Sequence, residues 1–160
     1  MNLPSITLWG FVATVVLTTM MAGAQGLGWS RMSIPFILGT MFTPNRDRAP
    51  LLGFLVHLAA GWMFAALYAL GFEGLGRATW WLGASGGLLH GTFVLVVGMS
   101  ILPGLHPRMA SERHGPTPTR ALQPPGFMAL HYGQWTPLIA LVAHVVYGAI
   151  LGGLYEPGGC

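Results

Sequence analysis

The sequence predicts an all-α integral membrane protein in which four transmembrane helices form a bundle. The chain has 160 residues, of which 53% are hydrophobic and only 7% are charged, whereas soluble domains carry about 25% charged residues. Four uncharged segments are long enough to cross a hydrocarbon core about 30 Å thick, which takes roughly 20 helical residues. We therefore expect a single transmembrane domain over residues 1–160 that is surrounded by the lipid bilayer.

The four helices follow from these apolar segments in chain order. We expect them at about residues 5–26, 50–72, 79–102 and 133–155. The residues before the first helix contain no Lys or Arg, so this helix is interpreted as a retained span rather than a signal peptide.

Two long loops, 27–49 and 103–132, alternate with one short link between the second and third helices. The first loop contains an apolar run from Ile34 to Phe42, which indicates either a short segment at the membrane interface or a simple connector. The second loop is rich in Pro and Gly and is too broken for a long helix.

The distribution of arginine predicts the orientation of the bundle. Six of the seven basic residues lie in the two long loops, namely Arg31, Arg46, Arg48, Arg108, Arg113 and Arg120. Positive charge favours the cytoplasmic side, so we expect both long loops in the cytoplasm and both termini in the periplasm.

All basic residues are Arg and none is Lys, which is typical of proteins encoded by GC-rich bacterial genomes and suggests a bacterial inner membrane. No basic stripe with interleaved aromatics indicates nucleic-acid binding.

The second and fourth helices share a pattern that suggests a duplicated helical hairpin. His57, Gly61 and Tyr68 have the same spacing as His144, Gly148 and Tyr155. The first and third helices match more loosely, with a constant offset of 81 residues. Such parallel repeats place binding sites at the interface between the copies.

Three histidines form the candidate site, because all lie near the bilayer midplane. At 1.5 Å per residue, His57, His90 and His144 are about 14 to 16 Å from the outer aromatic ends of their helices. An ionisable residue inside a membrane is a functional hypothesis by default. Each histidine follows, four residues later, a small residue that leaves space beside the imidazole; these residues are Gly53, Gly86 and Ala140.

Heme b, or another tetrapyrrole, between two neutral imidazoles is the ligand that this pattern favours. The axial pair would be His90 with His144 or His57 with His144. A metal ion bound by His57, His90 and His144 is an alternative, although no intramembrane carboxylate would balance its charge. The histidines can also simply hydrogen-bond between packed helices.

A second candidate site lies in the second long loop. His106, Arg108 and Arg113 offer donors for an anionic lipid headgroup. The alternative is that these charges only set the topology. The four carboxylates all lie in loops or at helix ends and no catalytic motif is present, so we expect no enzyme.

Three stretches resemble those of small bacterial four-helix membrane proteins of unknown function. They are Asn45 to Ala49, His106 to Met109 and Ala143 to Gly148. The resemblance implies a membrane location and carries over no functional residue.

Together these features predict a non-enzymatic bundle that binds heme at midplane histidines, as an accessory subunit of a larger membrane redox complex. Two alternatives stay open: a purely structural or assembly subunit without a ligand, and a small metal-ion or solute transporter, which would form a homo-oligomer because four helices enclose little volume.

Overall fold

The computed structural model describes residues 1–111 and 114–158. Four helices in it are long and apolar enough to cross a membrane, and they are Leu3–Gly26, Ala49–Gly74, Trp80–Leu105 and Thr136–Leu154. The described residues form helices and loops, with two isolated β-bridges and no strand. The predicted fold class is therefore confirmed, and the expected spans differ from the observed ones by a few residues at their ends.

Helices are labelled in chain order. Spans one, two and four are α1 (Leu3–Gly26), α3 (Ala49–Gly74) and α6 (Thr136–Leu154). The third span consists of α4 (Trp80–Phe93), a π-helical turn η1 (Val94–Gly98) and α5 (Met99–Leu105). The loops contain α2 (Ile34–Phe42) and a 3-10 segment η2 (Phe127–Tyr132).

Local sequence signals account for where these helices begin and end. Four helices have a proline in the first turn, where its missing N–H costs no hydrogen bond; these prolines are Pro4, Pro35, Pro50 and Pro137. Gly28 and Gly76, just beyond the ends of α1 and α3, adopt the positive φ that ends a helix with little strain.

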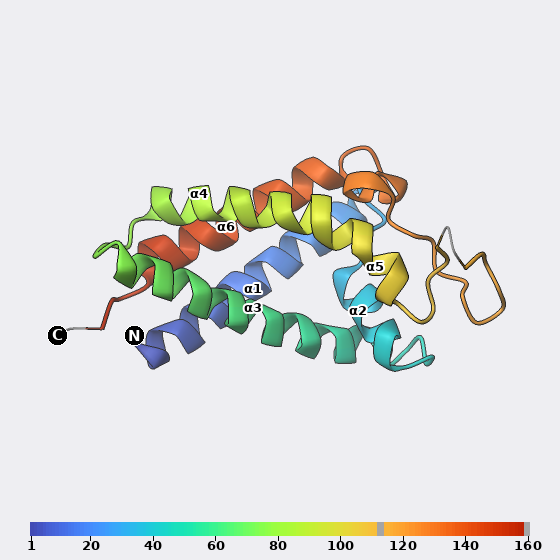
Figure 1. The fold of residues 1–160 in the computed structure, drawn as a ribbon, viewed down its shortest axis with the longest axis horizontal. Coiled ribbons are helices and arrows are strands. Elements are labelled where there is room, and N and C mark those ends of the chain that lie inside the picture. Colours follow the sequence, from blue (N-terminus) through green and yellow to red (C-terminus); the bar gives the residue numbers. More distant parts are fainter. Residues whose placement is uncertain (112–113, 159–160) are drawn as a thin grey trace.

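Different segments of the chain lie at the two ends of the bundle. The N-terminus and the described residues after α6 lie at the end where a short link joins α3 to α4, while α2 and the loop after α5 lie at the opposite end (Figure 1). From the link, α3 and α4 diverge along the bundle, and α1 packs against both α3 and α6 (Figure 1). This arrangement agrees with the predicted separation of the long loops from the termini.

Backbone contact through glycine joins α4 to α6. A Cβ added to Gly83 would lie 2.0 Å from the carbonyl oxygen of Gly148, and one added to Gly148 would lie 2.0 Å from that of Gly83. A Cβ on Gly87 would meet the carbonyl oxygen of His144 at 2.2 Å. Small residues permit this close approach, which is a main source of van der Waals packing between membrane helices.

The apolar run of the first long loop forms helix α2, which packs against the beginning of α3. A Cβ on Gly39 would lie 1.8 Å from the carbonyl oxygen of Ala49, and one on Gly53 would lie 1.7 Å from that of Pro35. The run is thus a packed helix rather than a simple connector.

The two hairpins pack in different registers. Gly61 of α3 packs on Thr14 of α1, whereas its counterpart Gly148 packs on Gly83 of α4. With the offset of 81 residues, the counterpart of Thr14 would be Leu95. The sequence pattern is therefore shared by the two hairpins, but the contacts between their helices are not.

Candidate functional site

The three midplane histidines line one cavity with a volume of about 270 Å³. Its wall is built by residues of α1, α2, α3, α6 and the third span. Most of the lining is aliphatic or aromatic, including Leu17, Phe64 and Leu95. The sequence-predicted histidines therefore converge on one apolar space.

His90 and His144 are in direct contact. Their ring centres are 4.8 Å apart in an edge-to-face arrangement, and Phe64 stacks on the other side of His90 at 3.8 Å. His144 is only 6% exposed, and its Nδ1–H donates to the carbonyl of Ala140 at 2.7 Å. This hydrogen bond assigns the proton to Nδ1 and leaves Nε2 of His144 as an acceptor.

Two imidazole nitrogens at the cavity lack a hydrogen bond. Nε2 of His57 and Nδ1 of His90 are buried, and neither has a partner among the described residues. Buried polar atoms are nearly always hydrogen-bonded, so each such atom requires an explanation. His57 and His90 both line the cavity, so a polar ligand bound there is one source of such a partner.

Tyr147 is a member of the site that the sequence analysis did not identify. Its side chain is 2% exposed, its ring lies 5.9 Å from that of His90, and its hydroxyl donates to the carbonyl of Gly61 at 2.6 Å. The only sequence signal is its position three residues after His144, on the same helical face.

The π-helical turn η1 is a second feature that the sequence did not predict. It begins four residues after His90, and Val94, Leu95 and Gly98 within it line the cavity. Single π-turns inside α-helices are rare and occur frequently at functional sites. Its position at the cavity wall therefore supports a functional role for this region.

Two of the three expected gaps beside the histidines are filled, which corrects the sequence-based expectation. The space over Gly53 is taken by the backbone of α2, and the space over Gly86 is taken by the ring of Tyr68, whose Cε1 would lie 3.0 Å from an added Cβ. Ala140 does line the cavity. The two glycines thus allow close packing, of α2 against Gly53 and of Tyr68 against Gly86, and leave no space there for a ligand.

Of the two predicted axial pairs, His90 with His144 fits heme poorly in this conformation. A macrocycle between two axial imidazoles keeps the rings apart, since each metal–nitrogen bond is about 2.0 Å long. The edge-to-face contact of His90 and His144 leaves no slot between them. Within the described residues, no group of three or more His, Cys, Asp or Glu side chains is arranged to hold a metal ion.

His106 and Arg108 of the second candidate site bind the end of α2. His106 is 3% exposed; its Nε2–H donates to the carbonyl of Ile37 at 2.9 Å, and its Nδ1 accepts from the backbone N–H of Arg108 at 3.1 Å. The guanidinium of Arg108 donates to the carbonyl of Thr40 at 2.6 Å. His106 is thus buried away from any headgroup, and Arg113 lies outside the described residues.

The environment of His106 predicts a dependence of stability on pH. Burial, assisted by the positive charge of Arg108, holds the pKa of His106 below its ordinary value, although the hydrogen bond to Ile37 acts in the opposite sense. Between this lowered pKa and about pH 6.5, the unfolded chain therefore binds a proton that the folded chain does not. The free energy of unfolding decreases as the pH is lowered through this range, by at most about 1.4 kcal/mol per pH unit for this group.

Melting curves of the wild type and of His106→Gln, recorded above and below that pH, test this expectation. Gln can keep the hydrogen bond to Ile37 but does not titrate, so the wild type should lose more stability on acidification. Equal losses in the two proteins would assign the pH dependence to other groups.

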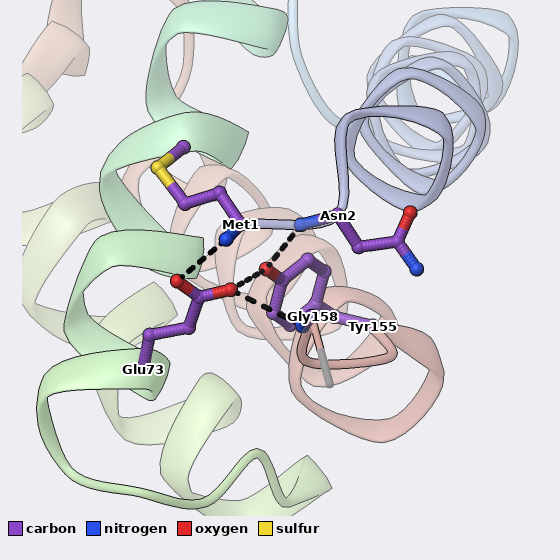
Figure 2. A network of polar contacts seen from close by, with 5 residues as sticks. All are labelled: Met1, Asn2, Glu73, Tyr155 and Gly158. Carbon is purple, nitrogen blue, oxygen red and sulfur yellow. Dashed lines mark hydrogen bonds and ion pairs between the residues drawn. The ribbon is translucent and has the colours of Figure 1, made fainter. Parts of the chain in front are cut away.

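Tyr68 and Tyr155, which are equivalent in the repeat, have different surroundings. The hydroxyl of Tyr155 donates to Glu73 at 2.6 Å and accepts from the backbone N–H of Asn2 at 3.2 Å, in a cluster where the amino group of Met1 pairs with Glu73 (Figure 2). The buried hydroxyl of Tyr68 has no partner among the described residues. The cluster joins α3 to the chain termini and lies at the end of the bundle away from α2.

Comparisons with protein-family models, with curated proteins and with solved structures give no match. The function therefore has to be inferred from the residues of the site.

Proposed function

We propose that this chain binds, inside the bilayer, a lipid-soluble ligand with a small ring-shaped polar head, of the quinone class, through His57 and His90. The observation that carries the proposal is that two histidines lining an apolar cavity each have a buried ring nitrogen without a hydrogen bond, Nε2 in His57 and Nδ1 in His90. The role that we propose is binding of this ligand by the two imidazoles.

The chemistry of the cavity supports this class of ligand. A neutral imidazole can donate a hydrogen bond to a quinone oxygen or accept one from a quinol hydroxyl, so the same two histidines serve both redox states. The aliphatic and aromatic walls suit a ring and the beginning of an apolar tail. The volume of about 270 Å³ is close to the lower end of the roughly 300–1,000 Å³ found for small-molecule sites.

The test is titration of a short-chain benzoquinone into the detergent-purified protein, followed by the shift of its melting temperature. The wild type should be stabilised, and His57→Leu and His90→Leu should each bind about fivefold more weakly, the effect of one lost hydrogen bond. His114→Gln is the matched control, because His114 lies in the second long loop and does not line the cavity. Absence of any shift in the wild type would contradict the proposal.

Heme b is the second candidate, and the orientation of His144 favours it. Metal-binding histidines usually donate their other ring N–H to a backbone carbonyl or carboxylate, as Nδ1 of His144 does to Ala140. Heme binding between His90 and His144 would require these two rings to separate. Visible spectra of oxidised and dithionite-reduced protein decide between the candidates. A Soret band that is lost in His144→Ala supports heme, whereas a featureless spectrum contradicts heme and favours a ligand of the quinone class.

The setting that we propose is a bacterial inner membrane, with α2 and the loop after α5 on the cytoplasmic side. The excess of arginine at that end of the bundle supports this orientation. A ligand of the quinone class or a heme suits an accessory subunit of a membrane redox complex.

A further inference from the structure

A groove with a volume of about 410 Å³ lies at the end of the bundle that carries α2. One wall is α2, with Phe36 and Thr40, and the other is the loop after α5, with Arg108 and Thr119. Arg46, from the segment between α2 and α3, completes it. The groove is separate from the histidine cavity and shares no lining residue with it.

Two guanidinium groups line this groove and are held by different contacts. The guanidinium carbon of Arg46 lies 5.0 Å from the ring centre of Phe36, a cation–π arrangement. Arg108 donates from one terminal nitrogen to the carbonyls of Thr40 and Met41, at 2.6 and 3.3 Å. A guanidinium has five N–H donors, so most donors of both groups stay available to a ligand.

Among the described residues, no Asp or Glu lines the groove. The ion pair that these residues form, between Met1 and Glu73, lies at the opposite end of the bundle (Figure 1). Two positive charges beside one groove repel each other, and an anion placed between them relieves this repulsion. The planar donor fork of arginine matches the oxygens of a phosphate.

The position of the groove points to a membrane lipid as the source of that phosphate. Arg46 precedes the first residue of α3, Ala49, where the apolar span begins. The apolar helix α2 forms one wall, and Phe42 at its end is 61% exposed. A charged groove beside such a helix lies at the level of the lipid headgroups, where basic residues attract anionic lipids.

We propose that the groove between Arg46 and Arg108 binds the phosphate headgroup of an anionic phospholipid. The site keeps Arg108 of the predicted cluster and adds Arg46, which the tertiary structure brings to the same groove, whereas His106 is buried and Arg113 lies outside the described residues. The headgroup joins the end of α2 to the segment that enters α3, so a bound lipid also stabilises the packing of α2.

Native mass spectrometry tests the proposal. The detergent-purified full chain is measured with added phosphatidylglycerol, phosphatidylcholine or inorganic phosphate. The wild type should retain phosphatidylglycerol in preference to phosphatidylcholine. Arg46→Gln should bind phosphatidylglycerol about tenfold more weakly, as expected for the loss of a charge-assisted hydrogen bond within a site. Arg48→Gln, two residues away and outside the groove, is the matched control and should bind like the wild type.

Three outcomes would overturn the proposal. Equal losses in Arg46→Gln and Arg48→Gln would indicate attraction by surface charge in general rather than a site. Equal retention of the two lipids by the wild type would exclude recognition of anionic headgroups. Inorganic phosphate that binds as tightly as phosphatidylglycerol, with the same dependence on Arg46, would assign the groove to a free anion.

Discussion

Replacement of Gly148 by alanine should lower the free energy of unfolding by about 1–3 kcal/mol, the usual cost of overpacking a close contact. The new Cβ would lie 2.0 Å from the carbonyl oxygen of Gly83, which is backbone and cannot rotate away. Helices α4 and α6 would have to separate, and contacts along both would weaken. The higher helix propensity of alanine, about 1 kcal/mol, offsets only part of this loss.

Gly153→Ala is the matched control for this prediction, because a Cβ there meets the side chain of Trp80 at an ordinary 3.4 Å. It keeps the gain in helix propensity without the backbone clash, so its stability should equal or exceed that of the wild type. Thermal unfolding in detergent, followed by circular dichroism, measures both variants. Equal stability of the two variants would show that the contact between α4 and α6 contributes little.

Replacement of Gly53 by alanine should detach α2 from the beginning of α3. The new Cβ would lie 1.7 Å from the carbonyl oxygen of Pro35, so the backbones of the two helices could not keep their positions. We expect a cost similar to that at Gly148, about 1–3 kcal/mol, concentrated in α2 because Pro35 lies in the first turn of this helix. Hydrogen exchange should therefore accelerate in α2 and stay slow in α6.

Gly71→Ala is the control in the same helix, since nothing lies within 4 Å of a Cβ at that position. Its exchange should match the wild type throughout. Because Ile37 and Leu38 of α2 line the histidine cavity, Gly53→Ala should also weaken binding of the benzoquinone probe. Unchanged exchange in α2 would contradict the packing of this helix on α3.

Hydropathy and length were sufficient to predict the four spans, because hydrocarbon requires about 20 apolar helical residues in each crossing. Absence of charge predicts the helix ends only to within a few residues. The turn η1 within the third span carried no comparable signal, since its residues Val94 to Gly98 are apolar like their neighbours.

The site could be predicted in part. The common depth of His57, His90 and His144 follows from counting residues along helices, and these side chains do line one cavity. The use of each neighbouring gap could not be predicted, because Gly53 and Gly86 are packed by Pro35 and Tyr68, which are distant in the sequence. That Arg46 and Arg108 line the same groove could not be predicted either, because they too are distant in the sequence.

The sequence by itself determined that the chain crosses the bilayer four times, with the arginine-rich loops at one end and histidines at middle depth. These properties depend on the free energy of transferring each segment into hydrocarbon, which follows from the residues of that segment without reference to the others. The tertiary structure decided which helices touch, through contacts such as Gly83 with Gly148, and which histidine nitrogens stay unpartnered. Such contacts depend on the rotation and register of helices against one another, and Gly- and Val-rich helices permit several registers with similar packing.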